Sequence, residues 1–312
     1  MGSLASVGES GRGTIQVRQP RRIVIAQCYA CAAREPRGLA RSGAGSHFQD
    51  YWGNRMRSLF SSALLLAGLS WATPGAAQTT ATSPCTQWIT EVPVTITAPG
   101  YYCLKQNITT NLVGGAIGIE SSDVTVDCRG RSISHQDPAN DAFGITAGGF
   151  GPVHDVKVRA CKLVDFGTGI VFGPGSDRVE ITGNDIVRPK LDGIVLWGSN
   201  SRITGNSVLA TSNPFYDYSR NITVTAFQPG VRSTGNVISG NTVAGAHGNG
   251  TIWGIRVDMS DDVLINNNNV IDLQPKDGGY AAAIVTDSPT SRIMNNVMMS
   301  RVGTNYGNMG SA

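Results

Sequence analysis

Residues 181–186 read ITGNDI, and this pattern decides the fold because it recurs along the chain. It returns as ITGNSV at 203–208 and as ISGNTV at 238–243. Less regular copies are INNNNV at 265–270 and IMNNVM at 293–298. The aligned Asn residues of successive copies are 22, 35, 27 and 28 positions apart. Steps of this length are typical of solenoid proteins, in which each repeat forms one turn of the structure.

A second pattern, a small residue followed by Ile, any residue and an apolar residue, precedes most copies of the first. It reads GIVF at 169–172, GIVL at 193–196, GIRV at 254–257 and AIVT at 283–286. Each unit therefore reads as two or three short β-strands joined by Gly, Asn, Asp and Ser turns. Helical periodicity, regular Leu spacing and the length of a four-stranded blade are all missing, which excludes the other common solenoids and propellers. A parallel β-helix remains, with corner Asn side chains stacked as a ladder.

The combined unit resembles the repeat of right-handed parallel β-helix proteins of the pectin-lyase-like superfamily. The segments PGYYCL at 99–104 and DVTVDC at 123–128 also resemble the first coils of secreted bacterial members. The resemblance implies an all-β fold, a single-stranded right-handed parallel β-helix. It leaves the activity open, because the superfamily includes lyases, hydrolases, epimerases and non-catalytic proteins.

The N-terminal part of the chain differs in composition from the repeats. Residues 1–55 carry eight Arg and no Lys, and they show no period of 2 or 3.6. Residues 56–77 combine Arg57, a short apolar run and small residues before Gln78, which is typical of a secretory signal peptide. We therefore expect translation to start at Met56; a genuine long basic leader is the alternative.

These features predict five segments. They are a disordered, misassigned upstream segment (1–55), a signal peptide (56–77), an N-terminal segment or cap (78–94), the β-helix (95–300) and a flexible C-terminal tail (301–312). The expected location is secreted or periplasmic, with no transmembrane span.

Charge is distributed unevenly. The 312 residues have a formal net charge of +3. Residues 1–77 hold nine basic and three acidic residues, so the remainder has 16 basic against 19 acidic residues and a net charge of −3. A case for nucleic-acid binding that rests on overall charge disappears with the leader.

Four cysteines follow the expected signal peptide: Cys85, Cys103, Cys128 and Cys161. An even number in an oxidising compartment predicts disulfides, with three connectivities open. Aligning the coils places Cys128 and Cys161 one position apart on adjacent coils, within bridging range. We therefore favour Cys85–Cys103 together with Cys128–Cys161.

The same alignment gives columns of outward-facing residues, in which Asp127 meets Arg159 and Lys157 meets Glu180. These are expected cross-coil ion pairs. The basic residues of the early coils are Arg129, Arg131, Lys157, Arg159, Lys162, Arg188 and Lys190.

Basic residues matter because uronate lyases use cations to neutralise a carboxylate and a basic side chain to remove the C5 proton. Arg188, Lys190 and Asp192 are accordingly candidate catalytic residues, and Arg129 and Arg159 are candidate substrate-binding residues. The Arg188-Pro189-Lys190 segment lacks the R-x-P-x-x-R spacing of pectate lyases. A solvated, ion-paired face is the alternative.

Two aspartates are candidate metal ligands. Asp258 and Asp287 have the same offset after Gly254 and Ala283, so they should be neighbours on adjacent coils. A carboxylate pair binds Ca²⁺ or divides the acid and base roles of glycoside cleavage. Asp residues in Asx turns at coil corners are the alternative.

Aromatic residues form a third group. An insertion at 213–218 carries Tyr216 and Tyr218, and with Trp197 and Trp253 these rings are candidates for stacking on sugars. The alternative is that they cover the apolar side of the solenoid. Asp137-Pro138-Ala139 has Ala where the Asp-Pro-His motif of alginate epimerases has His, which argues against epimerase chemistry.

The sequence thus predicts a secreted, single-domain, monomeric β-helix that binds or processes polysaccharide or a cell-envelope glycan, on a pectate/uronate-lyase-like or glycosidase-like scaffold. A non-catalytic structural, adhesion or envelope protein is the alternative. Ca²⁺ is the one candidate cofactor.

Overall fold

The computed structural model describes residues 85–137, 142–149, 151–213, 218–228, 230–276 and 279–299, together with the backbone of strand β31 at 306–310. The expected upstream segment, the signal peptide and Tyr216 lie outside the described residues. The described residues form β-strands and turns without a helix. None of them, therefore, forms an apolar helix of the length that a membrane crossing needs.

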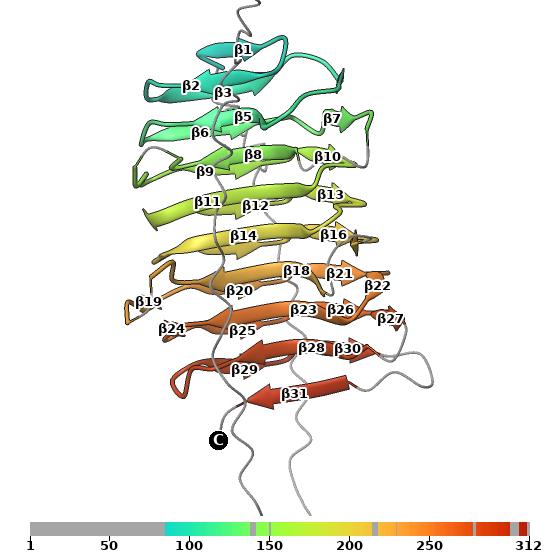
Figure 1. Ribbon diagram of the computed structural model, residues 1–312. Helices are drawn as coiled ribbons and strands as arrows, with labels where there is room; N and C mark the ends of the chain where they lie inside the picture. Colours follow the sequence, from blue (N-terminus) through green and yellow to red (C-terminus); the bar gives the residue numbers. More distant parts are fainter. Residues whose placement is uncertain are drawn as a thin grey trace, which may run out of the picture. The chain divides into compact units, whose positions relative to one another are not determined.

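Three parallel sheets account for most of the strands (Figure 1). Sheet A runs in the order β1 (Gln87–Ile89), β3 (Gly100–Leu104), β6 (Val124–Asp127), β9 (Lys157–Arg159), β12 (Glu180–Thr182), β15 (Arg202–Thr204), β20 (Val237–Ser239), β25 (Leu264–Asn266) and β29 (Arg292–Met294). Sheet B runs in the order β2 (Val94–Ile96), β5 (Gly115–Ile119), β8 (Phe143–Ala147), β11 (Thr168–Asp177), β14 (Asp192–Ser199), β18 (Tyr218–Thr225), β23 (Thr251–Asp258), β28 (Ala281–Thr286) and β31 (Tyr306–Gly310).

Sheet C and two small sheets complete the fold. Sheet C contains β4 (Ile108–Thr110), β7 (Ser132–His135), β10 (Lys162–Val164), β13 (Asp185–Val187), β16 (Ser207–Leu209), β21 (Thr242–Ala244), β26 (Asn269–Ile271) and β30 (Val297–Met299). The small sheets are β17 (Ser212–Asn213), β22 (His247–Asn249) and β27 (Gln274–Lys276), and β19 (Ser233–Thr234) with β24 (Ser260–Asp261).

Consecutive strands belong to different sheets, which defines the coil. For example, β11 lies in sheet B, β12 in sheet A and β13 in sheet C. Every pairing within the sheets joins one coil to the next in parallel. The expected all-β parallel β-helix is therefore confirmed. The parallel ladder begins with β1, inside the segment expected to be a cap, β2 starts at the last residue of that segment, and β31 lies inside the expected tail.

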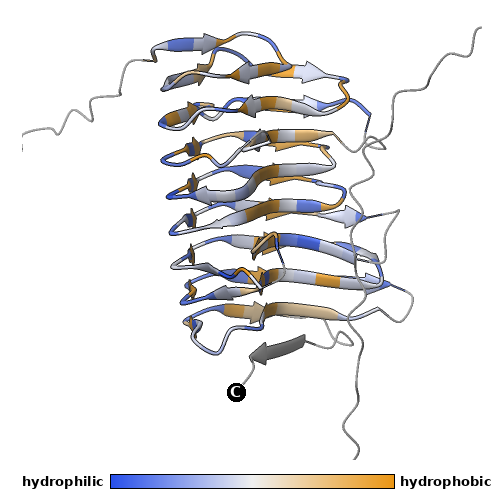
Figure 2. Ribbon diagram, turned by 60° about the vertical axis from the view of Figure 1, so that its left-hand side comes forward, coloured by the Kyte–Doolittle hydropathy of each residue, from blue (hydrophilic) through white to orange (hydrophobic). Residues whose placement is uncertain are grey.

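The core is a set of columns of inward-facing aliphatic side chains. Apolar segments of successive coils lie above one another in Figure 2. The column from sheet B is fully buried and consists of Ile117, Ile145, Ile170, Ile194, Ile222, Ile255 and Ile284. Because these side chains are removed from water along the whole stack, the core extends from coil to coil.

The recurring Gly-Asn pair forms the corner between sheets A and C. Gly183, Gly205 and Gly240 have φ of 61° to 64°, a left-handed conformation that a residue without a Cβ adopts at little cost. In the less regular copies Asn267 and Asn295 occupy this position, and Asn is the other residue type that tolerates it. The chain can therefore turn inward and bury the Asn that follows.

Those following Asn side chains form the expected ladder. The backbone and side-chain amides of Asn184 both donate to Oδ1 of Asn206, at 3.0 and 2.9 Å. The same pair of bonds joins Asn206 to Asn241, Asn241 to Asn268 and Asn268 to Asn296. Buried amides are costly unless they are hydrogen-bonded, so the ladder fixes the register of the coils.

Two disulfides connect the first coils in the pairing that the coil alignment favours. Cys85 is bonded to Cys103 with a Cα–Cα distance of 5.7 Å, and Cys128 is bonded to Cys161 with a distance of 4.6 Å. The second bridge joins adjacent coils directly, because β6 pairs with β9. Two disulfides fit a protein that is located outside a reducing cytoplasm.

Candidate functional site

Aromatic and charged side chains gather on the outer face of sheet B, over β14, β18 and β23. We call this cluster the sheet-B face; it consists of Asp192, Tyr218, Arg220, Trp253, Arg256 and Asp258. Asp192, Arg220 and Trp253 occupy one register position on the three strands, and the next outward position of β23 holds Arg256. Parallel pairing thus brings together residues that are up to 66 positions apart in the sequence.

A buried ion pair anchors one side of this face. The guanidinium of Arg220 donates from Nε and Nη2 to the two carboxylate oxygens of Asp192, at 2.5 and 2.7 Å. The side chains of Arg220 and Asp192 are only 11% and 5% exposed. The two-pronged geometry fixes the orientation of the guanidinium, which lies 5.0 Å from the ring of Tyr218.

A Trp ring lies at the centre of the face. The guanidinium of Arg256 lies 4.3 Å from the ring centroid of Trp253, within cation–π range. The ring of Tyr218 is 6.1 Å from that of Trp253, at an angle of 46°. Arg256 is in turn ion-paired with Asp258. Two aromatic rings are therefore held between two arginines, each of which has a carboxylate partner.

Burial raises the pKa of Asp258 above its ordinary value of 3.8. The guanidinium of Arg256 acts in the opposite direction, and the carboxylate of Asp287 raises the pKa further. Asp287 lies on the next coil, where its amide donates to the carbonyl of Val257 and one of its carboxylate oxygens accepts from the amide of Met259. Asp258 and Asp287 are thus the neighbours that the repeat offset predicts.

The hydroxyl of Thr223, next to this face on β18, has no hydrogen-bond partner among the described residues. Thr223 lies between the inward-facing Ile222 and Val224 of β18, so it points outward, yet it is only 2% exposed. Its Oγ1 is buried and makes no hydrogen bond within the part of the chain that the structure describes. An unpaired buried hydroxyl lowers the free energy of unfolding, so this part of sheet B is less stable than it would be with an apolar side chain at Thr223.

The sheet-B face brings together four residues that the sequence suggested for three separate roles. Asp192 was a candidate catalytic residue, Tyr218 and Trp253 were candidate sugar-stacking residues, and Asp258 was a candidate metal ligand. Sequence reasoning missed Arg220 and Arg256. Arg256 occupies the variable position of the GIRV unit, which is an outward-facing position in every coil, and this signal was available.

Arg188 and Lys190 lie elsewhere, in the corner between β13 and β14. Arg188 has a left-handed φ of 54° and donates to both carboxylate oxygens of Asp165, at 2.9 and 2.6 Å. Its side chain is 52% exposed. Arg188 is therefore paired with Asp165 and not with Asp192, although it is close to Asp192 in the sequence.

The remaining aromatic and acidic candidates lie at the far end of the same strands. Trp197, near the end of β14, contacts Phe227, with ring centroids 5.5 Å apart. Asp287 accepts from Arg232 at 3.2 Å. Because both Asp258 and Asp287 are paired with guanidinium groups, their contacts do not favour a Ca²⁺ site, and the calcium ligand role stays a prediction.

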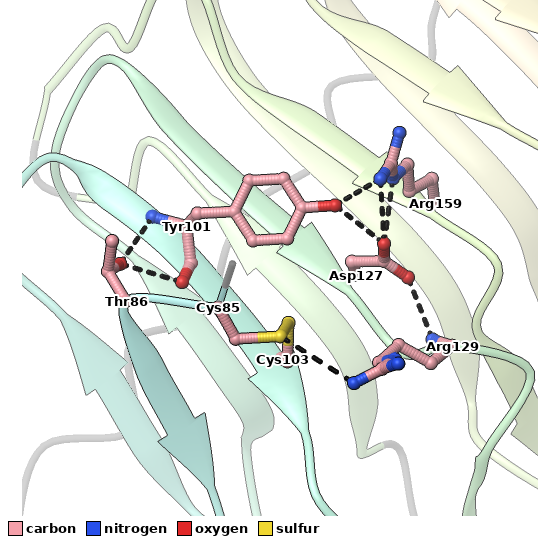
Figure 3. Close-up of a disulfide and its surroundings, with 7 residues drawn as sticks. All are labelled: Cys85, Thr86, Tyr101, Cys103, Asp127, Arg129 and Arg159. Atoms are coloured by element: carbon pink, nitrogen blue, oxygen red, sulfur yellow. Dashed lines mark hydrogen bonds and ion pairs between the residues drawn. A yellow bond between two sulfur atoms is a disulfide. The ribbon is translucent and has the colours of Figure 1, made fainter. Parts of the chain in front are cut away.

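A second cluster lies on sheet A in the first coils; we call it the Tyr101 cluster, and it consists of Trp88, Tyr101, Asp127, Arg129 and Arg159. Figure 3 shows Tyr101, Asp127, Arg129 and Arg159 beside the Cys85–Cys103 disulfide. The hydroxyl of Tyr101 donates to Oδ2 of Asp127 at 2.7 Å, and Arg159 donates to the same oxygen from Nε at 2.9 Å. The backbone amide of Arg129 donates to Oδ1 of Asp127 at 2.8 Å. The expected Asp127–Arg159 and Lys157–Glu180 ion pairs are both present.

The pKa of Asp127 is lowered from its ordinary value of 3.8. Burial alone would raise it, but the hydrogen bonds from Tyr101, from the Arg129 amide and from Arg159 favour the carboxylate. Arg159 also lies over the Tyr101 ring, 5.4 Å from its centroid, and Arg129 lies 5.6 Å from the Trp88 ring. The two arginines proposed to bind substrate are therefore engaged within the protein.

A third group of polar side chains lies at a corner of the early coils. Asp123, His154 and Asp155 place one potential metal-ligating atom each within 4.8 Å of one another. The carboxylate of Asp155 also accepts two hydrogen bonds from Arg178, at 2.8 and 2.7 Å. This guanidinium already supplies the positive charge that a metal ion would bring.

Comparisons with known proteins concern the fold. A family model described as "Right handed beta helix region" matches residues 143–310, which is more than half of the chain. The solved DFA-IIIase of Arthrobacter chlorophenolicus A6 is 13% identical, with a TM-score of 0.29, over 68% of this chain and 75% of that one. The A-module of the mannuronan C-5 epimerase AlgE4 of Azotobacter vinelandii is 14% identical, with a TM-score of 0.19, over 70% and 86%. No curated protein matches the sequence.

Proposed function

The chain belongs to the right-handed β-helix family, and we propose that it is a secreted protein whose sheet-B face binds polysaccharide. The observation that carries this proposal is the group formed by the tilted rings of Tyr218 and Trp253 and the guanidinium of Arg256. Aromatic rings suit the apolar faces of sugars, and the neighbouring charged groups suit their hydroxyls.

The ion pairs support binding over eliminative cleavage. A lyase needs a basic side chain that is free to accept the C5 proton. Arg220 is held by Asp192, and Arg256 is held by Asp258. Guanidinium groups paired in this way position hydroxyls well but are poor bases.

Rigid placement also supports the proposal. The face is built on strands of the solenoid, where register holds each side chain against the next coil, and binding sites on such elements keep their geometry. The pairing of Asp192 with Arg220 orients the guanidinium before any ligand arrives, which lowers the entropic cost of binding.

The experiment is isothermal titration of the purified protein with a panel of uronate and neutral polysaccharides. Trp253→Ala tests the face, and Trp88→Ala is its matched control, since Trp88 is an exposed Trp of the Tyr101 cluster. We expect Trp253→Ala to weaken binding at least tenfold, about 1.4 kcal/mol, and Trp88→Ala to leave it unchanged.

Two results would contradict the proposal. One is the absence of binding across the whole panel, which would favour a structural or adhesion protein. The other is an equal loss of affinity in both Trp variants. The appearance of unsaturated uronates, seen by ultraviolet absorbance, would overturn the preference for binding over elimination.

Hydrolysis is a second candidate function, and it depends on Asp258. A partly buried carboxyl with a raised pKa beside a second carboxylate is the arrangement of a general acid and its partner. If the protein hydrolyses a glycan, the release of reducing ends should be lost in both Asp258→Asn and Asp287→Asn, with binding retained. Hydrolysis that persists in both variants would exclude this pair.

A further inference from the structure

A pocket of about 310 Å³ lies where β14 and β18 end, beside the loop that leads to β19 at the left-hand edge of Figure 1. Its apolar lining includes Pro174, Trp197, Ala226, Phe227 and Val231. The volume is at the lower end of the range for small-ligand pockets, so it fits a substituent or a single ring. None of the contacts described for the sheet-B face uses this pocket.

The pocket is bordered by exposed apolar side chains. Phe227 and Val231 are 52% and 53% exposed, and they are among the few large apolar residues of the described chain that are so accessible. The ring of Phe227 meets that of Trp197 edge-on, at an angle of 61°. Single exposed apolar residues are ordinary, but several gathered around one hollow indicate a binding surface.

A guanidinium lies on the lining of the same pocket. Arg232 donates from Nε to Asp261 at 2.7 Å, and from Nη2 to Asp287 at 3.2 Å and to the carbonyl of Ser260 at 3.3 Å. Within the described residues, Nη1 of Arg232 has no such partner. Two carboxylates therefore fix this group and more than offset its single positive charge, while it keeps donors for a neutral acceptor.

The pocket continues the sheet-B face. Thr225 and Asp258 pair at the end of β18 and β23, directly beside the residues that enter the pocket loop. Asp287 lies next to Asp258 and also holds Arg232. Trp197 lies five residues beyond Asp192 on β14, about 16 Å along the strand, so a chain of sugars lying on the face along the strand direction would reach the pocket.

We infer that this pocket takes the acetyl group of an acetylated sugar residue. The methyl group would contact Trp197, Phe227 and Val231, and the carbonyl oxygen would accept from Arg232. A carboxylate ligand fits less well, because Asp261 and Asp287 already surround the guanidinium. The inference rests on the proposed function, since it places the rest of the glycan on the sheet-B face.

The test compares polysaccharides that differ only in acetylation. The ester pair is acetylated xylan and the same xylan after mild alkaline deacetylation. The amide pair is an N-acetylglucosamine oligosaccharide and its deacetylated form, which separates the two sources of the acetyl group. Affinities are measured by titration calorimetry for the wild type, for Phe227→Ala and for the control Val113→Ala, an apolar side chain that is 91% exposed in an early coil.

We expect the wild type to bind the acetylated member of at least one pair about tenfold more tightly. Phe227→Ala should remove most of this preference and leave the affinity for the deacetylated member unchanged. Val113→Ala should behave as the wild type. Since Phe227 is exposed, its loss should not unfold the protein, and circular dichroism at equal temperature checks this.

Equal affinity for both members of both pairs would overturn the inference, and so would a preference that survives Phe227→Ala. If binding is present and is weakened by Trp253→Ala without any acetyl preference, the pocket assignment fails while the proposed function stands. If none of these glycans nor any of the wider panel binds, both fail together.

Discussion

The Tyr101 cluster and the sheet-B face contain the same residue types, aromatic rings with Arg and Asp, but their polar groups differ in hydrogen bonding and in the direction of their pKa shifts. In the Tyr101 cluster, Asp127 receives hydrogen bonds from three residues, and its pKa is lowered. On the sheet-B face, burial raises the pKa of Asp258, and the hydroxyl of Thr223 is buried without a partner in the described chain.

The difference separates a structural cluster from a candidate binding site. Satisfied polar groups next to two disulfides stabilise the first coils, where the solenoid has no preceding coil in the described residues to support it. Unsatisfied or strained polar groups lower stability, and proteins keep them mainly where function requires them. Variants that change only stability or only binding can therefore test whether the two clusters have these separate roles.

The largest effect is expected from the disulfide between adjacent coils. Replacing both cysteines, Cys128→Ala with Cys161→Ala, removes a cross-link over 33 residues. The free energy of unfolding should fall by about 3–4 kcal/mol, because the unfolded chain gains freedom. Urea denaturation measures this change.

Glycan affinity of the folded double variant should be unchanged at low temperature. A loss of affinity with little change in stability would contradict the structural role of the first coils.

The next effect concerns Asp127→Asn, which removes the carboxylate from the Tyr101 cluster. The variant should be less stable by about 1–2 kcal/mol at pH 7, since charged hydrogen bonds from Tyr101 and Arg159 are lost but Arg159 is partly exposed. Because the folded-state pKa is lowered, this contribution is present above pH 3.8 and is lost as the pH falls below it.

Thermal unfolding between pH 7 and pH 2.5 provides the test. The stability of the wild type and of Asp127→Asn should converge as the pH decreases. A constant difference over the whole range would show that the carboxylate charge does not carry the effect.

The smallest effect is expected from Thr223→Val on the sheet-B face. Removal of a buried hydroxyl that has no partner should leave stability unchanged or raise it, by up to about 1 kcal/mol. Differential scanning calorimetry resolves such a shift in Tm. A clear destabilisation would mean that the hydroxyl of Thr223 makes a hydrogen bond in the folded protein. The two clusters would then no longer differ in this respect.

Repetition explains why much of the fold could be predicted from the sequence. Each Gly-Asn pair marks the same corner, so aligned copies give the register, the Asn ladder and the Cys128–Cys161 bridge. The residues of the sheet-B face were harder to assemble. The second sequence pattern begins with a small residue before Ile, but its copy at Asn221-Ile222-Thr223-Val224 begins with Asn. The strand that carries Arg220 was therefore not recognised as part of the repeat.

Sequence proximity also misled the assignment of the site. Arg188 and Lys190 precede Asp192 by a few positions, but Arg188 pairs with Asp165 at the corner before β14. Asp192 instead meets Arg220, 28 positions away, because β14 pairs with β18. In a solenoid, residues one coil apart are neighbours, and a motif that is continuous in sequence is divided by the corners.

The most direct test of the account is the affinity of Asp127→Asn and Trp253→Ala for the same polysaccharide, measured by titration calorimetry at neutral pH with both variants folded. The account predicts at least a tenfold loss of affinity for Trp253→Ala and an unchanged affinity for Asp127→Asn. An equal loss in both, or a loss confined to Asp127→Asn, would contradict the assignment of binding to the sheet-B face.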